Sequence, residues 1–159
     1  MLTIGVDPGT TGAYAILDDA GELLALEDLP TIADGRLRWI DASVLLPRLL
    51  ELKAGRPVRA IVERQQAMPA QGRSSCLTIG LALGALLATL QASGCAIELV
   101  SASAWKAAAG LGSDKSASLD RARLLYPLAS LDRQKDHNRA EALLIAHWAL
   151  TRAPRRAAA

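Results

Sequence analysis

The sequence predicts an α/β fold in which helices flank a mixed five-stranded sheet of three antiparallel strands followed by two parallel strands. Short apolar runs alternate with helical patterns, in the order three strands, helix, strand, helix, strand, helix, helix. Phe is absent and aromatic residues make up only 3%, so the core must consist of Leu, Ile, Val and Ala, which favours helices packed on a sheet. The 159 residues suit one domain over residues 1–150, with a flexible basic tail over residues 151–159.

Turn residues and apolar periodicity set the expected boundaries. Gly and Pro interrupt the apolar run 2–17, which predicts two strands joined by a tight turn. Asp41 is a candidate N-cap for the first helix, because its side chain can accept from the backbone N–H groups of that helix. The other expected elements are a strand at 21–29, a loop at 31–38, a helix at 42–53, strands at 58–63 and 96–100, a loop at 101–113, and helices at 114–126 and from about 135 or 138 to 150.

A long uncharged segment lies in the middle of the chain. Residues 74–97 contain no charged side chain, and Gly80, Gly84 and Ala88 recur at four-residue spacing. This pattern allows a membrane span. Scattered Ser, Thr and Gln residues and a stop signal at Ser93–Gly94 favour instead a core helix over residues 74–93, which is also the candidate dimer interface. No membrane partner is expected.

Charge and cysteine content limit the partners and the compartment. Ten of the 18 basic residues but only five of the 16 acidic residues lie in residues 101–159, which favours an anionic partner for the C-terminal third. Cys76 and Cys95 have no metal-ligand spacing and lie in apolar surroundings, which suits a reducing compartment. The N-terminus has no export-signal pattern, so we expect a protein of the bacterial or phage-infected cytoplasm.

Acidic residues recur at the ends of predicted elements. Asp7 ends the first strand, Glu63 ends the strand at 58–63, and Glu141 lies among apolar residues of the last helix. His137 is one helical turn before Glu141 and shares its face. Carboxylates that converge where two strands end beside a helix form an oxygen-rich pocket, which suits Mg²⁺ or Mn²⁺ better than zinc.

These segments resemble the RuvC family of Holliday junction resolvases, in particular its phage-type branch. The similar segments are Ile4–Gly9, Val62–Glu63, Trp105–Lys106 with Gly110, Gly112 and Lys115, and Lys135–Ala146. They occur in the family's order over roughly residues 2–148. The resemblance implies an RNase H-like fold, a homodimer, and symmetric paired nicks in a four-way DNA junction with two Mg²⁺ or Mn²⁺ ions per active site and no nucleotide cofactor.

The same resemblance implies roles for individual residues. Asp7, Glu63 and Glu141 match the family's metal-binding acids, with Asp7 bridging the two ions. The fourth position falls at His137, with Asn138 beside it, and Asp136 is an alternative that can join the metal site only if the helix begins after it. The residues implied to contact DNA are Lys106, Lys115, Arg139, Arg64, Arg73 and Gln66, and Gln65 and Met68 stand in the loop that enters the junction in the family.

Two other functions compete with this interpretation. The turn Asp7–Gly12 also resembles the first phosphate-binding turn of sugar kinases and actin-like ATPases, although those proteins need a second domain and a second glycine-rich turn. A non-catalytic module that binds branched DNA with the same fold is favoured by the His or Asn near position 137. Cleavage of a four-way junction, junction binding without nicks, and ATP turnover distinguish the three.

Overall fold

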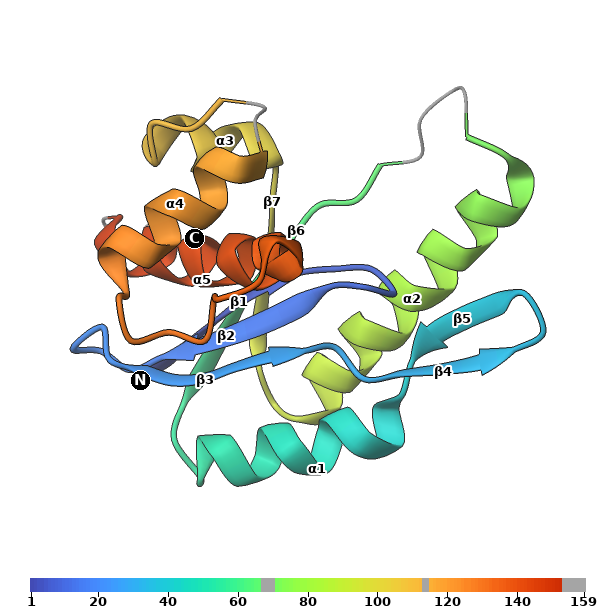
Figure 1. Cartoon of the computed structure of the whole chain (residues 1–159). Coiled ribbons are helices and arrows are strands. Elements are labelled where there is room, and N and C mark those ends of the chain that lie inside the picture. Colours follow the sequence, from blue (N-terminus) through green and yellow to red (C-terminus); the bar gives the residue numbers. More distant parts are fainter. Residues whose placement is uncertain (67–70, 113–114, 153–159) are drawn as a thin grey trace, which may run out of the picture.

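A computed structural model describes residues 1–66, 71–112 and 115–152 of the chain. Its central layer is a five-stranded sheet (Figure 1). Helices α3, α4 and α5 gather on one side of this sheet, whereas α1 covers the other side and α2 extends along a two-stranded hairpin. The helices are α1 (Ala42–Lys53), α2 (Arg73–Ala92), α3 (Ala102–Ala108), α4 (Lys115–Leu125) and α5 (His137–Thr151), with a short 3₁₀ turn at Gln134–Asp136.

The order of strands in the sheet is β3-β2-β1-β6-β7. Strand β1 pairs antiparallel with β2 and parallel with β6, while β2–β3 is antiparallel and β6–β7 parallel. This arrangement confirms the predicted mixed sheet. The bounds of its strands are β1 (Leu2–Asp7), β2 (Ala13–Leu17), β3 (Leu23–Asp28), β6 (Val58–Glu63) and β7 (Ala96–Val100).

Two apolar clusters cover the two faces of the sheet. One joins the sheet to α1 and α2 and includes Leu45 and Leu86. The other joins it to α3, α4 and α5 and includes Trp105 and Leu143. On this second face α5 approaches β1 so closely that a Cβ at Gly5 would lie 2.2 Å from the carbonyl oxygen of Ala142. A side chain larger than hydrogen therefore has no room there, and α5 packs directly on the backbone of β1.

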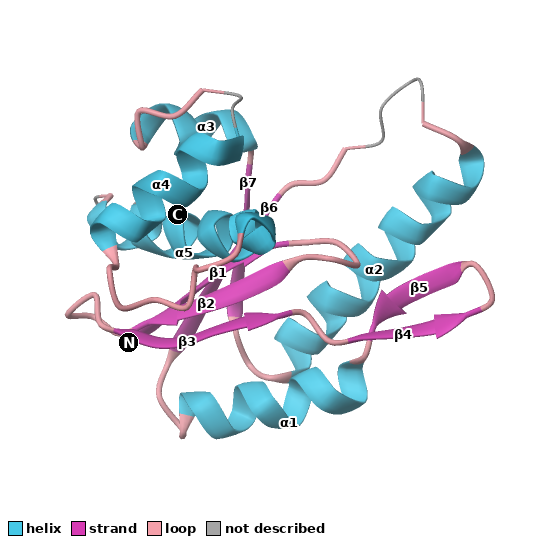
Figure 2. Ribbon diagram, in the orientation of Figure 1, coloured by secondary structure: helices cyan, strands magenta, loops and turns pink. Residues whose placement is uncertain are grey.

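Two loop predictions were wrong. Residues 31–38 are not a loop: β4 (Thr31–Asp34) and β5 (Leu37–Ile40) form a hairpin beside α2, as Figure 2 shows. Gly35 at the tip adopts a φ of 56°, which suits glycine, and β5 contacts α2. Within the predicted loop 101–113, residues 102–108 form α3, because this alanine-rich segment favours helix and buries Trp105 completely.

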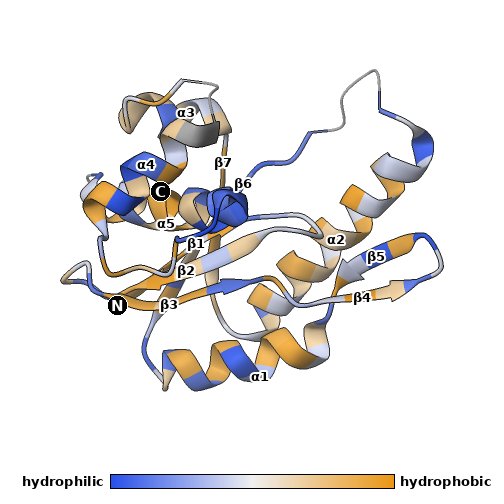
Figure 3. Cartoon of the chain, viewed as in Figure 1, coloured by the Kyte–Doolittle hydropathy of each residue, from blue (hydrophilic) through white to orange (hydrophobic). Residues whose placement is uncertain are grey.

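Helix α2 is a core helix on one side only. It is long and apolar enough to span a membrane by length and composition, a criterion that core helices also meet. Ala82, Leu86 and Leu90 are buried in the core, whereas Leu77 and Leu81 are exposed, so the expectation that this helix is buried on most sides was wrong. Hydrophobic residues continue along α2 beside the hairpin (Figure 3). The predicted tail lies mostly outside the described residues, so its flexibility stays a prediction.

Candidate active site

The first two acids end neighbouring parallel strands. Asp7 pairs in register with Ala13, and Glu63 pairs with Val100. Ala13 and Val100 both belong to the cluster beneath α3, α4 and α5. Since cross-strand partners share a face of the sheet, Asp7 and Glu63 both point to that face. The register Val6–Val62 places them side by side at the carboxyl ends of β1 and β6, as the sequence predicted.

A tryptophan of α3 holds Glu63. The Nε1–H of Trp105 donates to Oε2 of Glu63 at 2.8 Å. Burial raises the pKa of Glu63 above its ordinary value, and the negative charge of Glu141 adds to this rise, while the Trp105 hydrogen bond and the charge of Lys106 oppose it. Glu63 and Glu141 therefore lie close enough to interact electrostatically.

The third acid comes from α5 and is buried. Glu141 is 7% exposed. Its Oε1 atom accepts from the Lys106 ammonium at 2.7 Å and from the Ser118 hydroxyl at 3.2 Å. Three helices thus contribute to one carboxylate oxygen: α5 carries the acid, α3 the lysine and α4 the serine. The surrounding apolar cluster makes this charged contact part of the interior of the protein.

The turn after Asp7 is tied to the start of α5. A Cβ at Gly12 would lie 2.1 Å from the carbonyl oxygen of Asp7, so the turn folds back tightly on the acid. The Asn138 side chain donates to the carbonyl oxygen of Thr11 at 2.5 Å. His137 and Asn138 line a cavity of about 450 Å³ together with Thr10 and Thr11. Asp136, the third candidate for the fourth position, lines the same cavity, so all three candidates lie beside the loop that follows Asp7.

Asp136 is engaged elsewhere. Helix α5 begins at His137, so Asp136 precedes the helix, the condition under which the sequence allowed it to join the site. It is 3% exposed, and its carboxylate accepts from the backbone N–H of Arg133 at 2.9 Å and from the guanidinium at 2.6 Å. These contacts hold the pKa of Asp136 below its ordinary value. Both oxygens thus already have donors outside the cluster of acids.

The residues expected to contact DNA differ in their surroundings. Lys106 is bound to Glu141, and Arg139 makes a two-point contact with Asp28 at 2.6 and 2.9 Å. Arg64, Gln66 and Arg73 are exposed at the end of β6 and the start of α2. Lys115 begins α4, but its side chain and Met68 lie outside the described part of the chain.

The types of residue at the acidic site fit a hard divalent cation, because Asp7, Glu63 and Glu141 supply carboxylate oxygens. Oε1 of Glu141 already forms an ion pair with the ammonium of Lys106. In the described ranges no three His, Cys, Asp or Glu side chains are grouped closely enough to hold a metal ion. The donors from Trp105, Lys106 and Ser118 occupy carboxylate oxygens that a metal would use.

Two residues have roles that the sequence did not indicate. Trp105 was part of a motif, but its contact with Glu63 spans 42 positions. Ser118 belongs to no motif in the sequence, and its contact with Glu141 spans 23 positions. Ser118 is fully buried and lies in the first turn of α4. In the sequence, a serine at such a position does not indicate a contact with another helix. Only the packing of α4 against α5 shows its role.

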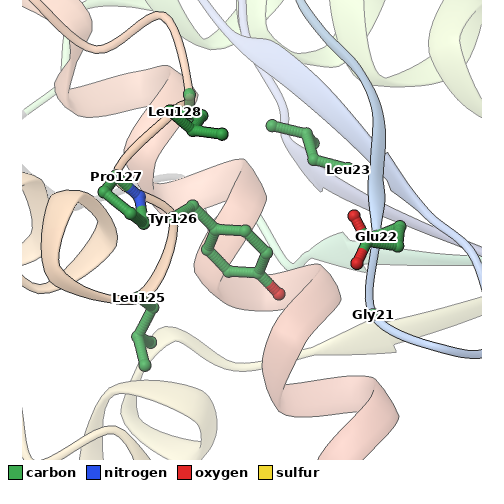
Figure 4. Close-up of a pocket in the computed structure, with 8 residues that line it drawn as sticks. Gly21, Glu22, Leu23, Leu125, Tyr126, Pro127 and Leu128 are labelled. Carbon is green, nitrogen blue, oxygen red and sulfur yellow. The ribbon is translucent and has the colours of Figure 1, made fainter.

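A second cavity, of about 370 Å³, lies between the turn at Gly21 and the end of α4 (Figure 4). Figure 4 shows the Tyr126 ring extending toward the segment that carries Glu22. The Tyr126 hydroxyl pairs with Nδ1 of His147 at 2.9 Å, and burial, with Glu22 adding, raises the pKa of Tyr126. None of the acids Asp7, Glu63 and Glu141 lines this cavity, so it is separate from the acidic site.

Known proteins are similar to this chain in sequence and in fold. No protein-family model matches the chain. The chain is 34% identical over 158 residues to the crossover junction endodeoxyribonuclease RuvC of Chloroflexus aggregans strain MD-66 / DSM 9485, with 92% of each chain covered. It superposes on T. thermophilus RuvC in complex with a Holliday junction substrate with a TM-score of 0.68 and 24% identity, over 94% of this chain and 93% of that one. A further Thermus thermophilus RuvC structure gives a TM-score of 0.57 and 20% identity over 94% of both chains.

These similarities confirm the predicted RNase H-like fold and the predicted class of enzyme. They cover more than nine tenths of the chain. The alternative of an actin-like or sugar-kinase ATPase gains no support from them. The chain belongs to the RuvC family of crossover junction endodeoxyribonucleases.

Proposed function

We propose that this protein resolves four-way DNA junctions by hydrolysing one phosphodiester bond in each of two opposed strands, with divalent metal ions bound by Asp7, Glu63 and Glu141. The observation that carries the proposal is the placement of acids from β1, β6 and α5 on one face of the sheet. The names of the relatives support the substrate, since one is a crossover junction endodeoxyribonuclease and another was solved with a Holliday junction. Membership of the phage-type branch stays a prediction.

Different residues have different roles at this site. When bound, a pair of Mg²⁺ or Mn²⁺ ions supplies an activated water and neutralises the leaving oxygen. Asp7, Glu63 and Glu141 hold these ions, and Trp105 fixes the orientation of Glu63 through its 2.8 Å hydrogen bond. His137, beside the turn that follows Asp7, orients a water or a phosphate.

Cations around the acids position the DNA. Lys106, Lys115, Arg139, Arg64 and Arg73 neutralise backbone phosphates, which fixes the register of the DNA without reading its bases. Exposed Gln66, at the end of β6, enters the junction. Arg139 is held by Asp28, so it presents its remaining N–H groups from a fixed position.

Cleavage of a synthetic four-way junction in Mg²⁺ or Mn²⁺ tests this function. We expect paired symmetric nicks from the wild type and a loss of about a thousand-fold or more in the variant Asp7→Asn, which keeps the size of the side chain but removes the charge that binds metal. Junction binding without nicks in either metal would overturn the enzymatic proposal and favour the non-catalytic module.

We also propose a homodimer formed through α2 and the β4–β5 hairpin. A groove of about 610 Å³ between these elements has an almost entirely apolar lining, made by Trp39, Cys76, Leu77, Gly80, Leu81, Gly84 and Ala85. Leu77 is 54% exposed and the two glycines allow close approach of another backbone. A two-fold dimer matches the symmetry of a four-way junction. Sedimentation at micromolar concentration tests this proposal, and a single species of 16.7 kDa would contradict it.

A further inference from the structure

The contact between Lys106 and Glu141 is an unusually buried ion pair for so small a protein. The lysine side chain is 20% exposed and the glutamate side chain 9%. Six other ion pairs of Lys or Arg in the described part of the chain each include at least one side chain that is 30% exposed or more. The ammonium also lies 5.1 Å from the centre of the Trp105 ring. Lys106 is thus fixed inside the acidic site and does not project into solvent.

We propose that the Lys106 ammonium is the resident counter-ion of this acidic site and that a divalent cation must displace it from Glu141 to bind. The proposal rests on the proposed function for the presence of the metal. It assigns Lys106 a role in the absence of DNA: the lysine neutralises the buried acid, competes with the metal, and becomes available to an anionic partner only after the metal has entered.

Charge and burial require such a counter-ion. A buried carboxylate without a partner is strongly destabilising, so Glu141 needs a cation in the metal-free protein. A divalent ion that used Oε1 of Glu141 as a ligand would compete for this oxygen with Nζ of Lys106, which lies 2.7 Å from it. Two cations held by one carboxylate repel each other in a partly buried site. Binding of the divalent ion therefore weakens the contact of Lys106 with Glu141, and the lysine weakens binding of the ion.

The side chains permit this exchange without unfolding α3. Lys106 reaches Glu141 through a flexible four-carbon stem, which can swing outward. Trp105, the preceding residue, contacts Glu63 through a different atom and is fully buried, so it anchors α3 while the lysine moves. Ser118 continues to donate to Glu141 from α4. The site thus keeps its shape as one cation replaces the other.

Calorimetric titration of the full chain with Mn²⁺ in the absence of DNA tests the competition. We expect the variant Lys106→Gln, which keeps a donor near Glu141 but removes the charge, to bind Mn²⁺ about tenfold more tightly than the wild type. Lys106→Arg keeps the charge and should bind Mn²⁺ like the wild type. Lys135→Gln is the matched control, because it removes one exposed positive charge that does not contact Glu141, and its affinity should stay within about twofold.

The competition would be overturned if Lys106→Gln bound Mn²⁺ no more tightly than Lys135→Gln, or if Lys106→Arg showed the same gain as Lys106→Gln. If no form of the protein bound a divalent cation, the proposed function itself would fail. If the wild type bound Mn²⁺ and the variants bound it equally well, the competition between Lys106 and the metal would be contradicted, but the proposed function would stand.

A measurement on the wild type avoids any effect of the substitutions on folding. In protein labelled with ¹⁵N on lysine, the Nζ resonance of Lys106 should be protected from solvent exchange before metal is added, because the group is held by a buried carboxylate. Saturating Mg²⁺ should abolish this protection, while the resonance of exposed Lys135 stays unchanged. Protection of Lys106 that persists at saturating Mg²⁺ would contradict displacement.

Discussion

The two faces of the sheet bury different chemistry. Against α1 and α2 the core is apolar, with leucines such as Leu45 and Leu86, and its main polar network, the contact of Tyr14 with Glu27 and Arg48, lies at one edge. Against α3, α4 and α5 the core surrounds Glu141, and the Nε1–H of buried Trp105 points to Glu63. The first face therefore stabilises the fold mainly by apolar packing, whereas the second must also hold charges inside the core. Burying charges on the face that carries Asp7, Glu63 and Glu141 costs stability, because charges removed from water need partners.

Truncation of one leucine on each face should give the largest effect that distinguishes the two faces. Leu86→Ala and Leu143→Ala both create a cavity at a fully buried position, so each should lower the free energy of unfolding by about 2–5 kcal/mol. Only Leu143 lies on the helix that positions Glu141, so only its truncation should also lower kcat for junction cleavage. Urea unfolding and cleavage at a temperature where both variants are folded measure the two effects. Equal losses of kcat would show that the faces are not functionally distinct.

Trp105→Phe should have a smaller effect, confined to the face that carries the three acids. It keeps most of the apolar packing but removes the N–H that donates to Glu63, at a cost of about 1 kcal/mol in stability. That hydrogen bond opposes the rise in the pKa of Glu63, so its loss raises the pKa further. Because the metal site needs the ionised carboxylate, the acidic limb of the pH–rate profile should move to higher pH. An unchanged profile would show that Trp105 only packs.

The smallest expected effect is on the opposite face, at Glu27. The hydrogen bond from Arg48 holds the pKa of Glu27 below its ordinary value of 4.5, and Tyr14 adds to this lowering. A lowered folded-state pKa means that the pair contributes stability above pH 4.5 and loses it as the pH falls through the folded-state value. Glu27→Gln should therefore lower the melting temperature at pH 7, by an amount that corresponds to about 0.5–1 kcal/mol for so exposed a pair, and by progressively less as the pH is lowered below 4.5. A difference that does not depend on pH would exclude this ion pair as the cause.

Most of the fold could be predicted because its signals are local. The first helix has the predicted bounds, and Asp41 caps it by accepting from the backbone N–H of Ser43 at 3.0 Å. The β4–β5 hairpin was missed because its signal is not local: Ile32 pairs with Trp39, and β5 packs against α2, more than thirty positions along the chain. Helix α3 was missed because it is only seven residues long and ends near glycines.

The acids of the site were predictable, but their partners were not. Asp7 and Glu63 end parallel strands, and any such pair on neighbouring strands meets at one edge of the sheet. The partners Lys106 and Ser118 reach Glu141 across 35 and 23 positions, through the packing of three helices, and no spacing rule connects them. The contact of Arg139 with Asp28 could not be predicted for the same reason, because the two residues are 111 positions apart. Arg139 was expected only to contact DNA.

The packing of α5 on Gly5 has a consequence for the synthesis of the protein. The three acids belong to β1, β6 and α5, so Glu141 is synthesised after Asp7 and Glu63. Because α5 packs directly on the backbone of β1, its docking completes both the core and the site in one step. A nascent chain that has not yet reached α5 thus lacks Glu141 and the seven α5 residues of the second apolar cluster, so under the proposed function the metal site is complete only after α5 has docked.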